Sequence, residues 1–258
     1  MMRIRSDVEL GNLTDLGLQR EINEDYYLYL EPESDEEFAR KGRLMLVADG
    51  MGGHNGGEVA SGLAAAMVRD AFVEAVDGDA HTILVDGFSR AQQAILERSS
   101  SDLDVKGMGT TCTAVIVHRG ALTFGHIGDS RLYLIRDGQL VQMTDDHTLV
   151  NQMVKTGALT AEEASSHDQK NVLTSALGMP SRSVSADFSE APFPLKARDI
   201  IVACSDGLHG LVSDQEINSI ASEQSSSAAC RSLVDLARER GAPDNITVQI
   251  LRILAVTP

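Results

Sequence analysis

Three aspartates stand at the ends of apolar, strand-like segments, where a carboxylate can meet solvent or a ligand. They are Asp49, which follows RLMLVA (43–48); Asp206, which follows DIIVACS (199–205); and Asp244, which comes just before NITVQILRI (245–253). If these strands lie side by side with suitable directions, the three carboxylates meet at one rim. Carboxylate oxygens without a Cys or His cluster favour Mg²⁺ or Mn²⁺ over Zn²⁺. The sequences SDG and DN are each typical of a simple turn, so only the combination indicates a metal site.

The first of these aspartates opens a glycine-rich segment, DGMGGHNGGE (49–58), which contains five glycines. Glycine loses more backbone freedom on folding than any other residue, so this run indicates either close backbone approach or a flexible loop. We favour close approach, with the Gly50 carbonyl oxygen as a further ligand for a hard metal ion. His54 lies inside the segment and is either a structural residue or a proton donor.

The chain has 258 residues and a formal net charge of −16. Its field repels nucleic-acid backbones and anionic lipid, so we expect neither nucleic acid nor a membrane as a partner. Part of the acidic excess also suits clustering around divalent cations. The three cysteines lack CxxC spacing and are expected to be reduced core residues: Cys112, Cys204 and Cys230. No signal peptide or membrane span is evident, so we expect a soluble, cytoplasmic protein.

Short β-rich segments dominate the chain, and Arg119-Gly120 and Asp137-Gly138 are predicted as tight hairpin turns. The expected strands are 26–30, 43–48, 110–118, 121–127, 130–136, 139–143, 199–205 and 245–253. We expect the first six to form an antiparallel meander. Helical periodicity covers 58–76, 82–98, 214–222 and 226–240. Paired helices between hairpins indicate an α+β fold of antiparallel sheets covered by helices, not a βαβ repeat.

Residues 147–180 differ from the rest, with short helical pieces, a capping box from Thr160 to Glu163 and the polar tip SSHDQKN. This composition predicts an insertion over a sheet edge or the rim of a site. The acidic segment EPESDEE (31–37) is expected to be an exposed, solvated loop. No repeat or low-complexity linker divides the chain, so we interpret 1–258 as a single domain.

Eight short motifs occur in one order along the chain. They are REINED (20–25), DGMGGH (49–54), GTT (109–111), GDSR (128–131), DDH (145–147), SALG (175–178), SDGL (205–208) and DNIT (244–247). In this order they resemble the bacterial branch of the metal-dependent protein phosphatases, the PPM or protein phosphatase 2C family, over essentially the whole chain. The resemblance implies a four-layer α/β/β/α sandwich of two antiparallel sheets flanked by helices, with a flap insertion at about 147–180.

The resemblance also implies a metal site at one end of the sandwich. Asp49 would bridge two metal ions, the Gly50 carbonyl would bind one of them, and Asp206 and Asp244 would complete the other. Asp129 of GDSR matches a ligand of a third, weaker metal. The alternative for Asp129 is a purely structural aspartate that shapes the turn between two strands.

Further residues match the family's catalytic positions. Arg20 matches the arginine that binds phosphate, and Glu24 and Asp25 match acidic residues that orient metal-bound water. Asn245 of DNIT is a secondary candidate. An arginine suits this task because its planar fork can bond two phosphate oxygens at once.

The proton donor for the leaving group is the least defined role. The eukaryotic branch has a histidine directly after the DG pair, whereas this chain has Met51 there. His54 takes that role only if the glycine loop folds back, and metal-bound water is the alternative. The other histidines, His118, His126 and His209, are expected to be structural.

These residues together predict a Mn²⁺- or Mg²⁺-dependent serine/threonine phosphoprotein phosphatase with two metals and room for a third. Two cations about 3.5–4 Å apart activate a bridging water for direct attack on phosphate. We expect phosphorylated Ser/Thr proteins as substrates, a cognate Ser/Thr kinase as the opposing enzyme, and a monomer. The rival is a pseudophosphatase that only binds, although this chain keeps the metal carboxylates and the arginine. Cysteine-dependent phosphatase chemistry is excluded because no arginine follows any cysteine by six positions.

Overall fold

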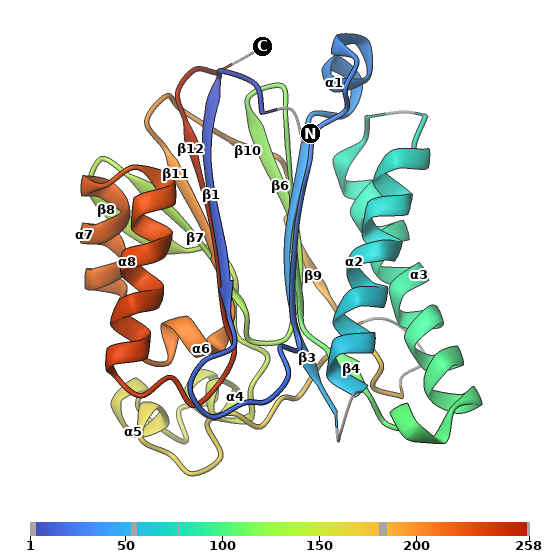
Figure 1. The fold of residues 1–258 in the computed structure, drawn as a ribbon, viewed down its shortest axis with the longest axis vertical. Coiled ribbons are helices and arrows are strands. Elements are labelled where there is room, and N and C mark those ends of the chain that lie inside the picture. Colours follow the sequence, from blue (N-terminus) through green and yellow to red (C-terminus); the bar gives the residue numbers. More distant parts are fainter. Residues whose placement is uncertain (1–3, 53–55, 77, 181–184, 257–258) are drawn as a thin grey trace.

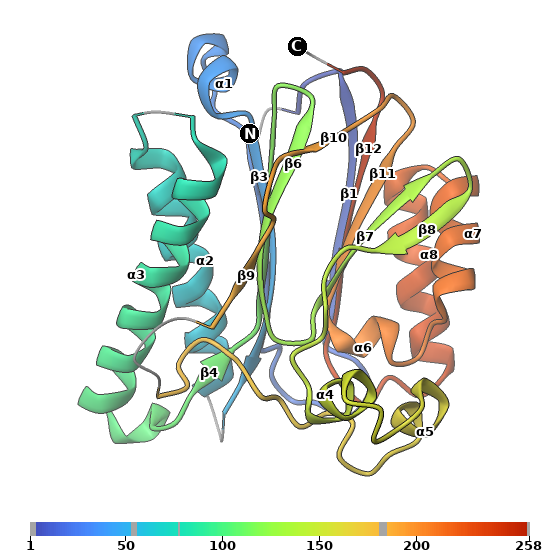
Figure 2. The same ribbon diagram turned by 180° about the vertical axis from the view of Figure 1, so that it is seen from behind.

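Four layers make up the protein in the computed structural model, which describes residues 4–52, 56–76, 78–180 and 185–256. Two antiparallel sheets face each other, and a pair of helices covers the outer face of each (Figure 1). The view from behind shows the same order of layers (Figure 2). The predicted α/β/β/α sandwich is therefore confirmed.

The first sheet has the strand order β10-β6-β5-β3-β2, with β9 added on β6 and β4 on β3. Its strands are β2 (Asp25–Leu30), β3 (Arg43–Met51), β4 (Gly109–Thr110), β5 (Cys112–His118), β6 (Ala121–Ile127), β9 (Asp187–Phe188) and β10 (Phe193–Pro194). Helices α2 (Gly56–Glu74) and α3 (Ala80–Ser101) cover it, and alanine-rich faces let them pack closely.

The second sheet has the order β1-β12-β11-β7-β8. Its strands are β1 (Val8–Asp15), β7 (Arg131–Arg136), β8 (Gln139–Gln142), β11 (Ile200–Cys204) and β12 (Ile246–Ile253). Helices α7 (Asp214–Glu223) and α8 (Ser226–Glu239) cover it. Apolar side chains such as Val47, Val115 and Leu251 fill the space between the two sheets.

Both predicted hairpin turns are confirmed. Arg119 and Gly120 join β5 to β6, Asp137 and Gly138 join β7 to β8, and all four residues have positive φ, as a type I′ turn requires. The expected six-strand meander is wrong, because β7 pairs with β11 rather than β6. The chain crosses between the sheets at Gly128, whose φ of 105° favours glycine.

The acidic segment 31–37 is a correction to the sequence prediction. Glu31 is only 4% exposed, and a short helix, α1 (Asp35–Lys41), begins within the segment after the N-cap Ser34. Glu31 can be buried because Arg43 and Arg5 both pair with it, at 3.2 Å each. These partners are far from Glu31 in sequence, so local composition gave no sign of them.

The insertion at 147–180 lies at one end of the sandwich, below the sheets in Figures 1 and 2. It contains α4 (Leu149–Lys155) and α5 (Ala161–Ser165), and the Thr160–Glu163 capping box is present. Its two ends are joined by a β-bridge between Thr148 and Leu173. No helix in the described part of the chain is long and apolar enough to cross a membrane.

The three cysteines are buried and unpaired, as expected. Burial raises the pKa of the Cys204 and Cys230 thiols to about 12 and raises the pKa of Cys112 as well. Such thiols stay protonated and are poor nucleophiles at neutral pH.

Candidate active site

The three strand-end aspartates meet at the end of the sandwich that carries the insertion. β11 and β12 are antiparallel neighbours, so Asp206, directly after β11, lies near Asp244, just before β12. The condition that all three strands lie side by side is not met by β3, which belongs to the opposite sheet. Asp49 reaches the same site across the sandwich, and its carboxyl group lies within hydrogen-bonding reach of Asp206.

Asp25 and Asp129 join these carboxylates, and the pKa values of Asp25, Asp49, Asp129 and Asp206 are raised. Burial is the largest cause in each case, and repulsion from neighbouring carboxylates raises the pKa further. The pKa of Asp25 rises to about 7 and that of Asp129 to about 8. The pKa values of Asp49 and Asp206 are also raised. A cluster of this kind must hold protons or be neutralised by cations.

One carboxylate oxygen of the cluster lacks a hydrogen-bond partner among the described residues. Asp25 Oδ2 accepts a hydrogen bond from Ser205 Oγ at 2.7 Å, whereas Oδ1 is buried without a partner among the described residues. Within that part of the chain, no three His, Cys, Asp or Glu side chains already form a closed ligand set. The donors are all oxygens, so the residues fit Mg²⁺ or Mn²⁺, with small movements needed to draw them together.

Arg20 supplies positive charge to this cluster. Its Nη2 lies 2.7 Å from Asp244 Oδ2, and its Nη1 lies 3.6 Å from Glu24 Oε2. The hydrogen bond to Asp244 is the main cause that raises the pKa of Arg20. The side chain is 45% exposed, so it can turn toward a ligand in solvent without leaving a buried void.

The glycine loop approaches the site closely. The Gly50 amide donates to the Glu24 carbonyl, and the Gly57 amide donates to Glu24 Oε1. A Cβ on Gly50 would lie 2.1 Å from the Gly57 carbonyl oxygen, and a Cβ on Gly57 would lie 2.3 Å from Glu24 Oε1. Close approach, rather than a merely flexible loop, explains these two glycines. His54 lies outside the described residues.

Asn245 holds the loop that carries Arg20. Its Oδ1 accepts the Glu24 amide at 2.8 Å, and its Nδ2 donates to the carbonyl oxygens of Leu16 and Ile22 at 3.0 and 3.1 Å. Asn245 is 3% exposed, and its amide is fully used in these bonds. Asn245 is therefore a residue that positions Glu24 and the loop carrying Arg20, rather than a candidate metal ligand.

Two threonines of the GTT motif fix Asp49, a role that the sequence did not indicate. The Asp49 amide donates to Thr111 Oγ1, and its carbonyl accepts from Thr110 Oγ1, both at 2.9 Å. Thr111 Oγ1 also bonds Ser130 Oγ, beside Asp129. The contacts of Thr110 and Thr111 with Asp49 join positions about sixty residues apart, so no local spacing could have revealed them.

The histidines outside the glycine loop have structural partners. His126 lies between Thr113 Oγ1 and the Asp145 carbonyl, and His209 Nε2 bonds the Asp129 carbonyl at 2.9 Å. Burial lowers the pKa of both rings to about 4, so they are neutral at physiological pH.

Comparison with known proteins decides the family. The sequence profile described as Protein phosphatase 2C matches residues 32–251. The chain belongs to the protein phosphatase 2C family. Curated relatives include serine/threonine phosphatase stp of Listeria monocytogenes, 34% identical over 92% of this chain and 93% of the relative. Protein phosphatase PhpP of Streptococcus pneumoniae is 35% identical over 95% of this chain and 97% of its own.

Solved structures agree with this placement. The S. agalactiae serine/threonine phosphatase superposes with a TM-score of 0.86 at 34% identity, covering 95% of this chain and 99% of that one. The catalytic domain of the phosphatase PstP, in complex with two manganese ions, gives 0.81 at 33% identity, covering 96% and 99%. The present chain is thus a serine/threonine phosphatase of the 2C type.

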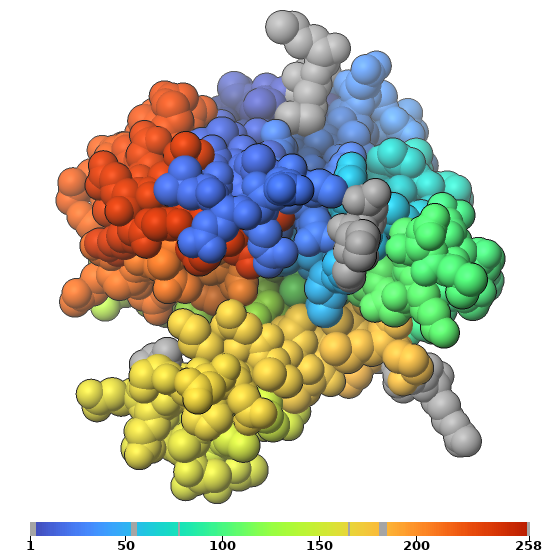
Figure 3. Space-filling model, turned by 60° about the horizontal axis from the view of Figure 1, so that its bottom comes forward, coloured from blue at the N-terminus to red at the C-terminus, as the bar shows by residue number. Residues whose placement is uncertain are grey.

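In this 2C phosphatase a cavity of about 440 Å³ adjoins the aspartates. Asp129, Asp206 and Asp244 line one side, while Val150 and Lys170 are among the residues of the insertion that line the other. Figure 3 shows the insertion, in yellow, standing apart from the N-terminal loop, in blue, at this end.

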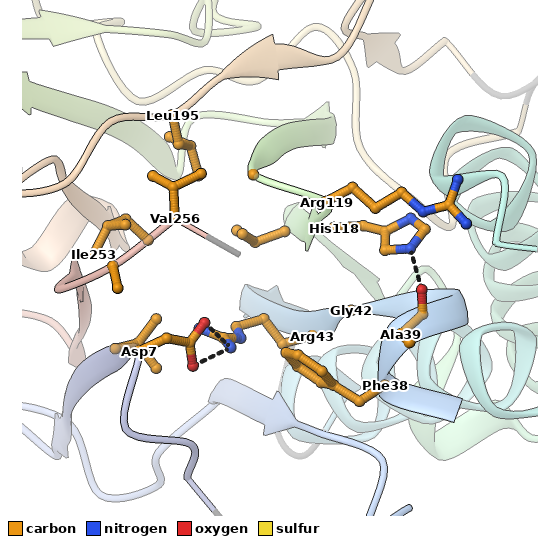
Figure 4. Close-up of a pocket in the computed structure, with 14 residues that line it drawn as sticks. Asp7, Phe38, Ala39, Gly42, Arg43, His118, Arg119, Leu195, Ile253 and Val256 are labelled. Atoms are coloured by element: carbon orange, nitrogen blue, oxygen red, sulfur yellow. Dashed lines mark hydrogen bonds and ion pairs between the residues drawn. The ribbon is translucent and has the colours of Figure 1, made fainter. Parts of the chain in front are cut away.

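A second pocket, of about 110 Å³, lies at the opposite end of the sandwich (Figure 4). Two of its charged side chains are paired with each other, since Arg43 Nη2 bonds both oxygens of Asp7. His118 bonds the Ala39 carbonyl. This pocket lacks the unbalanced carboxylates of the first and is not the candidate active site.

Proposed function

We propose that this phosphatase hydrolyses phosphoserine and phosphothreonine in proteins with two divalent cations, Mn²⁺ or Mg²⁺, held by Asp49, the Gly50 carbonyl, Asp206 and Asp244. The observation that carries the proposal is the cluster of buried carboxylates with raised pKa values and an unpartnered oxygen on Asp25. When bound, such cations activate water for direct attack and neutralise the phosphate. The single domain comprises 1–258, with residues 147–180 as its flap.

Arg20 binds the phosphate in this proposal. It already stands at the mouth of the cluster, paired with Asp244 and Glu24. If a bound cation neutralised Asp244, the Arg20 guanidinium would be free to direct two N–H groups at two phosphate oxygens. Glu24 and Asp25, both largely buried beside the cluster, would accept hydrogen bonds from the attacking water. Asn245 keeps Glu24 in place.

Asp129 provides a ligand for a third, weaker cation. Its side chain is 7% exposed, and it lines the cavity beside Asp206. Burial and Asp206 raise the pKa of the Asp129 carboxyl group to about 8. A role as ligand of a cation explains such a buried carboxylate better than a role in shaping a turn. The structural alternative predicts no effect of Asp129 on metal dependence.

The proposed substrates are phosphorylated Ser/Thr proteins, and we propose a Ser/Thr kinase as the opposing enzyme. The relatives named as serine/threonine phosphatases support this substrate class. We further propose a cytoplasmic monomer. The net charge of −16 disfavours nucleic acid and anionic lipid as partners.

Hydrolysis of a phosphoserine and phosphothreonine peptide panel tests the proposal directly. We expect turnover with Mn²⁺ or Mg²⁺ and none after chelation, with activity restored when the cation is added back. A pseudophosphatase would bind the peptides without turnover under every metal condition. Turnover that survives complete chelation would contradict the metal site.

A further inference from the structure

The DDH motif (145–147) has no role in the proposed chemistry, yet its histidine contacts the loop that presents Asp129. The His147 amide donates to the Gly128 carbonyl at 2.8 Å, and the Gly128 amide donates to His147 Nδ1 at 3.2 Å. Both polar backbone groups of Gly128 are thus held by one residue. Gly128 immediately precedes Asp129, so His147 fixes the direction in which the chain enters Asp129.

A second contact holds the other side of the same loop. Arg131 Nε lies 3.0 and 3.1 Å from the two carboxylate oxygens of Asp146, and Arg131 Nη2 lies 2.7 Å from Oδ2. Arg131 follows Asp129 by two positions. The residues that flank Asp129 are therefore tied to two consecutive residues, Asp146 and His147.

His147 also forms the base of the flap. Its carbonyl accepts the Thr174 amide at 2.8 Å, next to the bridge between Thr148 and Leu173. The chain leaves for the flap and returns from it at this one place. Any displacement of the flap base is passed to Gly128 through two hydrogen bonds.

A carboxylate fixes the orientation of the His147 ring. Nδ1 accepts the Gly128 amide, so Nε2 carries the proton in the neutral ring and donates to Asp187 Oδ2 at 3.1 Å. This arrangement resembles the outer contacts by which carboxylates orient groups around metal sites. It also links the loop to Asp187 at the start of β9.

We propose that His147 is a positioning residue for Asp129, and that through it the base of the flap controls how tightly the third cation binds. The inference rests on the proposed function, in which Asp129 is a ligand of that cation. His147 touches neither substrate nor metal and acts only through Gly128. Without the His147 ring the loop keeps the backbone bond from residue 147 to the Gly128 carbonyl, the His209 bond to the Asp129 carbonyl and the Arg131–Asp146 contact. It loses the side-chain acceptor of the Gly128 amide.

Calorimetric Mn²⁺ titration of the otherwise intact protein tests the inference. We expect His147→Ala to weaken the weakest Mn²⁺ site by about 10-fold, the lower end of the range for outer contacts, and to leave the tighter sites within about 2-fold. His147→Asn retains a short acceptor toward Gly128 and should recover part of this loss. The control is His167→Ala on the flap, whose ring accepts only the nearby Gln169 amide among the described residues.

A double mutant distinguishes positioning from general stability. In the Asp129→Ala background, adding His147→Ala should change Mn²⁺ binding no further, because the ligand that it positions is gone. An equal weakening in both backgrounds would overturn the inference, as would an unchanged weak site in His147→Ala. If His147→Ala does not fold, Asp187→Ala removes the second ring contact from an exposed position, and an unchanged weak site in that variant is contrary evidence.

The same titrations separate this inference from the proposed function. If Asp129→Ala leaves all Mn²⁺ sites unchanged, the proposed third site itself fails. If Asp129→Ala removes the weak site while His147→Ala and Asp187→Ala leave it intact, only the positioning role fails.

Discussion

Both ends of the sandwich bury acidic side chains, but the two ends balance their charge in different ways. Opposite the active site, Arg43 binds Asp7 and lies 3.2 Å from Glu31. The charges there are paired, although Arg43 Nε and Nη1 form no hydrogen bond among the described residues. At the active site, several carboxylates face one another, and a buried oxygen of Asp25 has no partner among the described residues. Buried charges that are neutralised by other side chains are typical of a structural ion pair. Buried negative charge without such a partner indicates a binding site for a cation.

Arg43→Ala should have the largest effect and should act on stability. It leaves Glu31 and Asp7 with less neutralising charge in a buried setting, which typically costs about 3–5 kcal/mol. Thermal and denaturant unfolding would measure this loss, and the Mn²⁺ dependence of the remaining folded protein should be unchanged. Arg90→Ala, which breaks exposed ion pairs with Glu74 and Asp86, is the control and should cost far less. Equal losses from the two variants would remove the contrast.

Asp206→Asn should have the opposite profile. It removes a proposed charged ligand of the metal. Loss of a residue that only supports a ligand lowers activity by up to about 100-fold, so we expect the loss of the ligand itself to lower turnover at least that much. The metal-free protein should become slightly more stable, because one member of a repelling cluster loses its charge. Steady-state kinetics at saturating Mn²⁺ and unfolding of the metal-free protein give the two values. Near-normal turnover in a folded variant would refute the ligand assignment.

Arg20→Ala should reduce substrate binding more than metal binding. Loss of a charged contact to phosphate costs about 1.5–3 kcal/mol in kcat/KM. The Asp244 carboxylate loses its competing partner, so Mn²⁺ affinity should be kept or improved. Phosphopeptide kinetics combined with calorimetry would show the two effects. Unchanged kcat/KM would mean that Arg20 only pairs with Asp244.

The pH dependence of stability should differ between the metal-free and Mn²⁺-bound protein. In the metal-free protein the pKa of Asp25 is about 7 and that of Asp129 about 8, against an ordinary 3.8. Their stabilising contribution is complete below about pH 3.8 and is lost as pH rises toward 8. The pKa of His126 is lowered to about 4 from 6.5, so it acts in the opposite direction only below 6.5.

Between pH 6.5 and 8 the metal-free protein should therefore lose about 1.5 kcal/mol of unfolding free energy per pH unit from these two groups. Saturating Mn²⁺ should abolish most of this slope, because the carboxylates are then needed in their charged form. Denaturant unfolding at several pH values measures the slope. A flat profile without metal, or the same slope with Mn²⁺, would show that these carboxylates are not held protonated in the folded state.

The sequence predicted the features that depend on local patterns. The apolar, β-rich segments predicted most of the strands, and the Arg119-Gly120 and Asp137-Gly138 turns predicted two hairpins. The division of the strands into two sheets was implied only by the family resemblance. The clustering of Asp206 and Asp244 followed from their positions at strand ends. Each of these signals lies within a few residues of the feature that it predicts.

The missed features depend on contacts between distant residues. Glu31 is buried because Arg5 and Arg43 reach it, although its own segment is strongly acidic. The connection of Asp49 to Thr111 also becomes visible only when two strands are paired. Strand β1 was missed because its residues are mostly only half-buried and show a weak apolar pattern.

The most direct test is Mn²⁺ calorimetry on the metal-free protein at pH 7 in two buffers with different ionisation enthalpies. The account predicts at least two bound Mn²⁺ ions per chain and a buffer-dependent heat, because binding expels protons from carboxyl groups whose pKa values are raised, such as Asp25. Asp206→Asn should remove at least one of these ions. Absence of binding, or binding whose heat is independent of the buffer, would contradict the claim that cations complete this carboxylate cluster.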